Sequence, residues 1–425
     1  MKKSIIILSV IAAWSFLAVS MTSCCGVRRV EVPDAHDVVM YQINPRVFAA
    51  NNSLQAVTQR LDSISDLGVN VLWFMPLYEI GQVKTVNSPY CIKDYKSLNP
   101  EFGTFTDFDK LVREAHRRGM SVIIDWVANH TSWDSEWIQK HPEWYTQDSL
   151  GVIISPAGTG WNDVADLNFD NMEMRQEMIE SMKYWVLEHG VDGFRCDAAD
   201  FVPFDFWKQA VDELRALPDC NLLLLAEGRR KDHFDAGFDM NYAWGYLSAL
   251  RRVFRRGASV SALVQADSSE YAGVDPDKVK LRFISNHDES VRRSAVEEFG
   301  GERGAMAAFI ATTFIRGGML IYDSQEVGYV GGIDFFKYVP VDWCANSAYL
   351  EEYKSVVKFY NDHPAVRRGH QVIYPHDDVL MFERVWEDDH VLVLVNLRDK
   401  EIEVTIPDDG TRYFLKPYEY ILETK

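Results

Sequence analysis

Acidic side chains follow short apolar runs at three places in this sequence, and two of them have an arginine or a histidine close by. The acids are Asp197, Glu227 and Asp288; Arg195 stands two residues before the first, and His287 directly before the third. Carboxyl groups that meet in one pocket can cleave a glycosidic bond when one stays protonated and another stays ionised. The residue types therefore predict acid–base and nucleophilic chemistry on a sugar.

Each of these residues has an ordinary alternative role when it is taken alone. A single aspartate after a strand is usually the N-cap of a helix, and an arginine beside an aspartate usually forms a structural ion pair. All of them follow apolar runs, however, and this repeated placement favours one shared site. Residues two apart on a strand point to the same face, so we expect Arg195 to hold Asp197 ionised. Glu227 lies between an apolar run and Gly228, and we expect burial to raise its pKa.

Side chains this far apart in the chain meet only if the elements before them lie side by side. Eight short apolar runs alternate with helical patterns. The runs are residues 38–43, 69–74, 121–125, 191–196, 222–226, 238–242, 280–285 and 318–322. Some, such as 222–225, are apolar without alternation, which is typical of parallel strands covered on both faces. Eight strands with intervening helices predict an α/β fold, the (β/α)8 TIM barrel, whose active site lies at the carboxyl ends of its strands.

Two segments depart from this alternation and set the domain boundaries. Residues 132–171 are rich in Trp, Gly, Pro and Asp, and we interpret them as a short domain B excursion after the third strand. After a helical pattern at 349–363, the tail has strand-like segments separated by turns. These are residues 372–383, 391–396, 402–406 and 412–422. We therefore predict a catalytic barrel over 38–366 and a C-terminal all-β sandwich domain over 367–425.

The first residues have the pattern of an export signal. Lys2 and Lys3 precede an apolar run at 5–19, which has the length of a signal h-region and is short for a membrane span. The run leads to a Met-Thr-Ser triplet before Cys24, which resembles the lipidation site of a bacterial lipoprotein. We expect lipidation at Cys24, with Cys25 as a competing acceptor and a plain secretory peptide as the alternative. The expected segments are a signal peptide over 1–23 and a linker over 24–37.

The amino-acid composition limits the classes of molecule that the protein can bind. The chain has 44 Lys and Arg against 63 Asp and Glu, and its net charge of −19 repels phosphate backbones, so nucleic-acid binding is excluded. We expect membrane contact through the lipid anchor only, while the membrane face and the oligomeric state stay open. The remaining cysteines form no Cys-x-x-Cys pair, so we expect small core residues. They are Cys91, Cys196, Cys220 and Cys344.

The polar motifs and several flanking segments together resemble the α-amylase superfamily, glycoside hydrolase family 13. The residues that match its four conserved regions are, in order, Asp125 with Asn129 and His130, Gly193-Phe194-Arg195 with Asp197, Glu227, and Phe283 with Asn286, His287 and Asp288. Further similar segments are 68–76, 90–104, 166–168 and 317–328. The resemblance runs from residue 38 to the C-terminus, and four ordered motifs make it specific.

Carried over position by position, the resemblance implies catalytic and binding roles. It implies Asp197 as the nucleophile, Glu227 as the acid/base, and Asp288 as a third carboxylate that binds ring hydroxyls and helps to distort the sugar. The substrate-binding residues that it implies are Tyr90, His130, Arg195 and His287. It also implies a barrel with domain B and a β-sandwich domain C, acting on an α-glucan oligosaccharide or polysaccharide by retaining hydrolysis.

Some positions depart from the family pattern. Asp200 and Phe201 stand where many members carry a Lys-His pair, so we expect different contacts to the sugar on the leaving-group side. We expect no required cofactor; Asn129 matches a family calcium ligand by position, and either Ca²⁺ or a hydrogen bond to a loop fits it. Ala198 is typical of α-1,4-acting members, whereas Asn168 is typical of the oligosaccharide-acting branch, so the substrate size stays open.

Two other functions fit parts of this pattern. A transglycosylase or isomerase on the same barrel differs only in how well it excludes water from the glycosyl-enzyme, and the sequence does not separate it from a hydrolase. A non-catalytic glycan-binding or partner subunit is expected to lack the carboxylates, and this chain keeps all three. Adjacent strands lie about 4.8 Å apart, which fits the short carboxyl separation of retaining enzymes. We therefore predict a retaining glycosidase.

Overall fold

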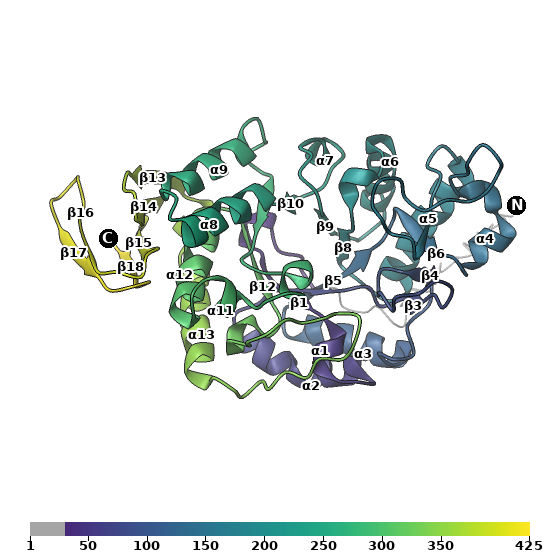
Figure 1. The fold of residues 1–425 in the computed structure, drawn as a ribbon, viewed down its shortest axis with the longest axis horizontal. Helices are drawn as coiled ribbons and strands as arrows, with labels where there is room; N and C mark the ends of the chain where they lie inside the picture. Colours follow the sequence, from purple (N-terminus) through teal and green to yellow (C-terminus); the bar gives the residue numbers. More distant parts are fainter. Residues whose placement is uncertain (1–29) are drawn as a thin grey trace, which may run out of the picture.

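Eight parallel strands close into a barrel at the centre of the protein (Figure 1). The structure is a computed structural model, and it describes residues 30–425. Around the barrel the strands are β1 (Val39–Ile43), β12 (Gly318–Tyr322), β11 (Val279–Arg282), β10 (Met240–Tyr242), β9 (Leu223–Ala226), β8 (Gly193–Cys196), β5 (Ser121–Trp126) and β2 (Val71–Phe74). Each predicted apolar run overlaps one of these strands, and the expected (β/α)8 TIM barrel is confirmed.

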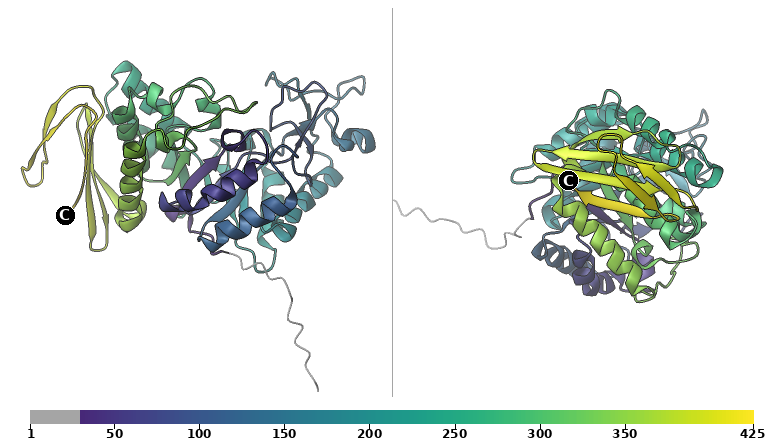
Figure 2. Two further views of the ribbon diagram at one scale, coloured as in Figure 1. Left: turned by 90° about the horizontal axis from the view of Figure 1, so that it is seen from below. Right: turned by 90° about the vertical axis from the view of Figure 1, so that its left-hand side faces the viewer.

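Helices between the strands cover the outside of the barrel (Figure 2). The main ones are α2 (Ser53–Asp66), α3 (Phe105–Arg117), α5 (Met172–Glu188), α6 (Phe204–Arg215), α8 (Trp244–Arg256), α9 (Ser261–Tyr271), α12 (Glu302–Thr313) and α13 (Ser347–Asp362). The strands are buried on both faces, which explains why β2 and β9 contain no polar residue. A capping box between Thr104 and Asp107 starts α3 at the end of the preceding loop.

One glycine of the barrel decides how closely β8 and β9 approach. Gly193 begins β8 with φ at +149°, and a Cβ there would lie only 1.9 Å from the carbonyl oxygen of Leu223. No side chain fits at that separation, so glycine is required at this position. The resulting register pairs Cys196 with Ala226 and aligns the carboxyl ends of the two strands.

The excursion after the third barrel strand is a small antiparallel subdomain. Strand β6 (His130–Ser132) pairs with β7 (Val164–Asp166), and α4 (Glu136–Lys140) lies between them in the chain. The excursion therefore starts with His130 itself, two residues before the predicted boundary. A second small pair, β3 (Glu79–Ile80) with β4 (Ile92–Asp94), follows β2. Figure 1 shows both pairs on the same side of the barrel, together with α4.

The C-terminal strands form two antiparallel sheets. They follow α14 (Pro364–Arg368), and the larger sheet contains β13 (His370–Tyr374), β14 (Val379–Trp386), β15 (Asp389–Asn396) and β18 (Tyr420–Thr424). The smaller sheet pairs β16 (Ile402–Thr405) with β17 (Arg412–Leu415). Met381 and Leu394 of the first sheet share a core with Val404 and Leu415 of the second, as in a sandwich. Figure 2 shows this domain across one end of the barrel, where it contacts α12 and α14.

Two of the predicted C-terminal strands were wrong in their extent. The run predicted at 372–383 is divided between β13 and β14, and the run at 412–422 between β17 and β18. Pro375 and Pro417 lie in the two separating turns, and proline has no N–H group to donate within a sheet. Tyr418 adds a left-handed backbone, with φ at +57°. At the first break the chain turns back, so that β13 and β14 form an antiparallel pair. At the second break the chain passes from β17 in the smaller sheet to β18 in the larger sheet.

The segment before the barrel is described only from residue 30 onward. The predicted signal peptide and Cys24 lie outside the described residues, whereas the end of the predicted linker forms a short 3-10 helix, η1 (Ala35–Asp37), whose Asp37 binds Arg368. None of the helices in residues 30–425 combines the length and apolar character needed to cross a membrane.

Cys91 and Cys196 are buried as expected. Cys220 is half-buried and Cys344 exposed, so the prediction of core positions was wrong for these two.

Candidate active site

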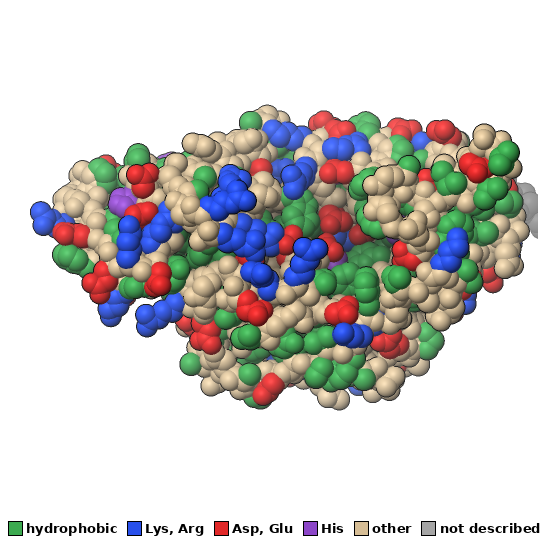
Figure 3. Space-filling model, viewed as in Figure 1, with side chains coloured by type: hydrophobic (Ala, Val, Ile, Leu, Met, Phe, Trp, Pro, Cys, Tyr) green, Lys and Arg blue, Asp and Glu red, His purple; other side chains and the backbone are tan. Residues whose placement is uncertain are grey.

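A pocket of about 270 Å³ opens where the barrel strands end. The residues that line it are Val86, Ser88, Tyr90, His130, Trp161, Asp163, Val164, Asp197, Ala198, Glu227, His287, Asp288, Phe335 and Phe336. Figure 3 shows the opening as a hollow near the centre of this face, where acidic and apolar side chains meet. All three predicted carboxylates and three of the four predicted binding residues thus lie in its wall, while Arg195 lies buried beneath it.

Arg195 connects the carboxylates under the pocket. Its Nη1 donates to Oδ1 of Asp197 at 2.8 Å and to Oδ1 of Asp125 at 2.7 Å, and its Nη2 lies 2.9 Å from Oε2 of Glu227. The guanidinium group is fully buried, and within residues 30–425 its ion pairs are with these three carboxylates. Asp197 and Glu227 follow directly after the paired residues Cys196 and Ala226, which places them on neighbouring strands about 4.8 Å apart.

Burial gives the two central carboxyl groups unequal tasks. Desolvation, aided by the charge of Asp197, raises the pKa of Glu227 to about 7. Desolvation also raises the pKa of Asp197 above its ordinary value, while the charge and the hydrogen bond of the Arg195 guanidinium lower it, which is the direction expected for a partner that keeps Asp197 ionised. Of these two carboxyl groups, Asp197 accepts a hydrogen bond from Arg195, whereas Glu227 accepts one from the backbone N–H of Ala198 at 2.8 Å. A single proton shared between them therefore resides on Glu227.

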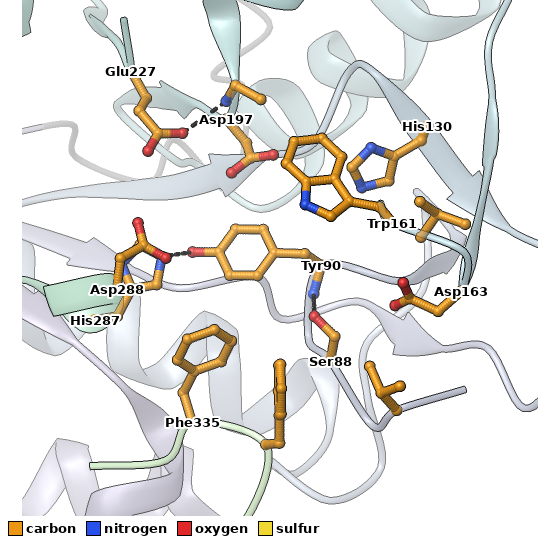
Figure 4. Close-up of a pocket in the computed structure, with 14 residues that line it drawn as sticks. Ser88, Tyr90, His130, Trp161, Asp163, Asp197, Glu227, His287, Asp288 and Phe335 are labelled. Atoms are coloured by element: carbon orange, nitrogen blue, oxygen red, sulfur yellow. Dashed lines mark hydrogen bonds and ion pairs between the residues drawn. The ribbon is translucent and has the colours of Figure 1, made fainter. Parts of the chain in front are cut away.

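On the other side of the pocket, His287 is held by a defined network (Figure 4). Gln42 Nε2 lies 2.7 Å from Nδ1 of His287, so Nδ1 accepts and Nε2 carries the hydrogen. That Nε2 lies 2.7 Å from the hydroxyl of Tyr90, which in turn donates to Asp125 Oδ2 at 3.1 Å. Burial lowers the pKa of His287 to about 3, which keeps the imidazole neutral. Asp288, directly next in the chain, keeps 46% of its side chain exposed to the pocket.

His130 occupies the wall formed by domain B. It begins β6 and pairs with Asp166 of β7, and its ring lies edge-on to Trp161 with centroids 5.5 Å apart. Asn129 Nδ2 lies 3.3 Å from its Nδ1, so Nε2 carries the hydrogen. Burial lowers the pKa of His130 to about 4. Both histidines are thus neutral donors at neutral pH, as a ring-hydroxyl contact requires.

Several pocket residues were not predicted from the motifs. Trp161 and Asp163 come from domain B, and Phe335 and Phe336 come from the segment between β12 and α13. Phe335 packs edge-on against the ring of His287, with centroids 5.4 Å apart. The aromatic content of residues 132–171 was the one available signal for Trp161. No motif or periodicity marks the irregular segment that carries the two phenylalanines.

The contacts of Asn129 bear on the two roles considered for it, a calcium ligand or a hydrogen bond to a loop. Throughout residues 30–425, no group of three or more His, Cys, Asp and Glu side chains is placed to hold a metal ion. The side-chain amide of Asn129 faces His130, and its backbone carbonyl accepts from the N–H of Leu167 at 3.2 Å. These contacts are those of the other expected role, in which Asn129 ties a loop. The mechanism proposed for this site uses no metal ion.

Comparison with known proteins finds sequences and structures of alpha-amylases that are similar to this chain. The family model described as alpha amylase, catalytic domain, matches residues 42–149 and 159–242. Alpha-amylase MalA of Haloarcula japonica is 28% identical over 403 residues, covering 89% of this chain and 58% of that protein. Alpha-amylase 2 of Dictyoglomus thermophilum is 25% identical, with 82% and 64% covered. The chain thus spans about three fifths of the length of these two relatives.

Solved structures agree over nearly the whole described chain. An alpha-amylase from Lactobacillus plantarum has a TM-score of 0.83 at 26% identity, and the match covers 92% of this chain and 99% of that one. The noncanonic maltogenic alpha-amylase AmyB from Thermotoga neapolitana has a TM-score of 0.81 at 24% identity, with the same coverage. The second likeness concerns the fold alone.

Proposed function

We propose that this chain carries a catalytic domain of the alpha-amylase family and hydrolyses α-glucosidic bonds with retention of configuration; the match to the family model and the likeness to alpha-amylases support this. The observation that carries the proposal is the pair Asp197 and Glu227. They lie at the ends of adjacent strands on one buried arginine; burial raises the pKa of both, that of Glu227 to about 7, while Arg195 donates a hydrogen bond to Asp197. Carboxyl groups this close leave no room for a water molecule between sugar and base, so one of them attacks the sugar itself.

The first step transfers the sugar to the protein. Glu227 gives its proton to the glycosidic oxygen while a carboxylate oxygen of Asp197 forms a bond to the anomeric carbon. The bond between that carbon and the leaving oxygen breaks, and the leaving sugar departs as a neutral alcohol. Glu227 remains as a carboxylate beside a glycosyl ester of Asp197, which is the nucleophilic form of covalent catalysis.

The second step returns the active site to its starting state. Glu227 removes a proton from an incoming water, whose oxygen bonds to the anomeric carbon as the bond to Asp197 breaks. Two inversions at one carbon give overall retention. Each group thus alternates between two forms, and Arg195 offsets the negative charge that moves between the two carboxyl groups.

The remaining pocket residues orient the ring that is cleaved. Tyr90 and His287 are stacked, with ring centroids 5.3 Å apart, and this pair presents a flat apolar face to the pocket. The neutral imidazole of His130 can donate to a ring hydroxyl without adding charge, whereas the Nε2 hydrogen of His287 is engaged by the Tyr90 hydroxyl. The exposed carboxylate of Asp288 can accept from two adjacent hydroxyls. These contacts support the roles inferred from the motifs.

The names of the relatives support an α-glucan substrate. They include alpha-amylases, a maltogenic alpha-amylase and an oligo-1,6-glucosidase. Because Ala198 follows the nucleophile, we propose a preference for α-1,4 over α-1,6 bonds. Reducing-sugar release from maltoheptaose, pullulan and isomaltose measures it, with Asp197→Asn as the inactive control. Turnover of isomaltose above that of maltoheptaose contradicts the linkage preference, and products that contain new linkages without net hydrolysis favour the transglycosylase or isomerase.

We also propose that the protein is exported and anchored by lipid at Cys24. The support is the sequence pattern of a basic start, an apolar run and a cysteine that follows small residues. A single acyl chain binds a membrane only marginally, so stable anchoring needs more than one chain. Replacing Cys24 and Cys25 together by alanine is expected to move the protein from the membrane fraction to the soluble one. Unchanged membrane association of this double variant refutes the anchor.

A further inference from the structure

A buried arginine lies behind the pocket wall and does not line the pocket itself. Arg46 belongs to the short helix α1 (Pro45–Phe48), which closely follows β1, and it is only 1% exposed. The side chain of Asn44 caps this turn by accepting from the N–H of Arg46 at 3.0 Å. The arginine is therefore held at the end of a barrel strand, next to the loops around the pocket.

All five N–H groups of the Arg46 guanidinium have acceptors. Its Nε donates to Oε1 of Glu101 at 2.8 Å and its Nη2 to Oε2 at 2.7 Å, which makes a bidentate ion pair. Its Nη1 donates to the backbone carbonyls of Asn87 at 2.9 Å and of Phe335 at 3.0 Å. Nη2 also donates to Oδ1 of Asn87 at 3.3 Å. Glu101 thus fixes one edge of the guanidinium, while the other hydrogen bonds hold two separate loops.

The two loops that Arg46 joins both carry aromatic residues of the pocket. The loop between β3 and β4 carries Tyr90, and the irregular segment after β12 carries Phe335 and Phe336. Asn87 connects the loops a second time, because its Nδ2 donates to the carbonyl of Phe336. The rings of Tyr90 and Phe335 meet edge-on with centroids 6.0 Å apart, and Figure 4 shows them beside each other in the pocket. Arg46 and Asn87 therefore join two parts of one wall.

The segment that carries the two phenylalanines has no helix or strand to fix it. Within residues 30–425, the hydrogen bonds that join residues 334–338 to other segments come from Arg46 and Asn87. The others lie inside the segment, where Asp334 binds the N–H groups of Phe336 and Lys337. The Phe335 carbonyl is buried, and a buried carbonyl without a donor costs free energy. The position of this segment thus depends on the arginine.

We propose that Arg46 is a positioning residue for the hydrolysis, because it holds the two loops in the arrangement that fits the sugar ring before the substrate binds. This inference rests on the proposed glycoside hydrolysis. A preorganised site binds a ligand without the entropy cost of ordering its loops. Without the arginine, substrate binding has to order both loops, and this cost falls equally on the bound substrate and on the transition state. The loss of Arg46 therefore raises KM and leaves kcat nearly unchanged.

Arg46→Lys is the first variant that tests this role. A lysine ammonium has its three donors on one atom, so it can stay with Glu101 but cannot span Glu101 and both loops. We expect KM for maltopentaose to rise about tenfold, while kcat per folded protein stays within about twofold. Hydrogen–deuterium exchange, followed by mass spectrometry, is expected to become faster in residues 82–88 and 334–338 and to stay the same in the barrel strands.

Asn87→Gly is the second variant, and it leaves the arginine in place. The backbone of Asn87 is left-handed, with φ at +62°, and glycine adopts this conformation without strain. We expect faster exchange in residues 334–338, which lie far from residue 87 in the chain, and a KM between those of the unaltered protein and Arg46→Lys. Because both residues belong to one network, the double variant is expected to lose no more than Arg46→Lys alone.

Matched controls separate this role from the loss of a buried arginine or of a left-handed asparagine. Arg384 is also 1% exposed but lies on β14 of the C-terminal domain, so Arg384→Lys is expected to leave KM and the exchange of both loops unchanged. The same is expected of Asn52→Gly, because Asn52 has φ at +55° and its side chain caps no helix.

Two results overturn the inference. One is a lower kcat at unchanged KM in Arg46→Lys, and the other is unchanged exchange in both loops. If Arg46→Lys does not fold, Asn87→Gly decides the question by the same two measurements. If the unaltered protein cleaves no α-glucoside, the proposed function itself fails, and the exchange measurements still show whether Arg46 holds the two loops.

Discussion

Replacing Glu227 by glutamine tests the division of labour between the two central carboxyl groups. The amide keeps the shape of the side chain and can still accept from the N–H of Ala198, which is 2.8 Å from Glu227 Oε2. It has no transferable proton. The first step with an oligosaccharide, whose leaving oxygen needs a proton, should therefore slow by about 10²–10⁴-fold. An α-glucosyl fluoride needs no proton on its leaving group, so its first step should be largely spared.

The pKa of Glu227 sets the magnitude and the pH dependence. With a pKa of about 7, roughly 90% of Glu227 is protonated at pH 6, against roughly 3% for a carboxyl at the ordinary value of 4.5. Burial thus supplies about 30-fold more of the active acid at that pH. Because the protonated form is the one that reacts, kcat/KM for an oligosaccharide should fall as the pH rises through about 7.

The assay compares pH profiles for the two kinds of substrate. In Glu227→Gln the fall near pH 7 should disappear, and the fluoride substrate should release about one equivalent of fluoride per protein before stalling, because the base for the second step is missing. Mass spectrometry should then find one glycosyl group on Asp197. The exposed Glu173→Gln on α5 is the control and should behave as the unaltered protein. An oligosaccharide rate that is unchanged in Glu227→Gln refutes the assignment of the acid.

Three further predictions follow from the geometry. Asp197→Asn should abolish turnover, and proton NMR of the unaltered protein should show the α-anomer first; early β-anomer would indicate inversion and refute Asp197 as the nucleophile. Arg195→Met leaves buried carboxyl groups without their cation, so the free energy of unfolding in urea should fall by about 3–5 kcal/mol. That loss of unfolding free energy should be larger at pH 8 than at pH 5. A carboxyl group whose pKa is higher in the folded state than in the unfolded state contributes less to stability as the pH rises. An equal loss at the two pH values contradicts this reasoning. Gly193→Ala should cost about 3 kcal/mol or prevent folding, whereas Gly119→Ala, which has open space around it, should cost about 1 kcal/mol; similar losses would refute the steric argument.

The strands of the barrel were predictable because they depend on local composition. A parallel strand covered on both faces needs a short apolar run, and the chain has eight such runs in the right order. The breaks within the C-terminal strands were marked by Pro375 and Pro417, whose significance is clear only once the hairpin partners are known. The start of domain B at His130 was not predicted, because His130 belongs both to the motif that follows the third barrel strand and to β6.

The sequence by itself determined which residues could carry the chemistry. Asp197, Glu227 and Asp288 follow strand ends, and in a closed parallel barrel all strand ends lie at one face, so their convergence was implied by topology alone. Tyr90 was identified by motif resemblance, and its contact with His287 depends on a loop that no periodicity defines. The roles of the carboxyl groups were implied by the same resemblance.

Only the tertiary structure decided the balance of charge and the shape of the pocket. The pKa of Asp197 depends on a competition between desolvation and one guanidinium, and neither the depth of burial nor a hydrogen-bond direction can be read from residue spacing. Trp161 and Phe335 come from two irregular segments, whose conformations are set by contacts with distant parts of the chain. Local patterns fix strands and helices, whereas long-range packing fixes the loops that select the substrate.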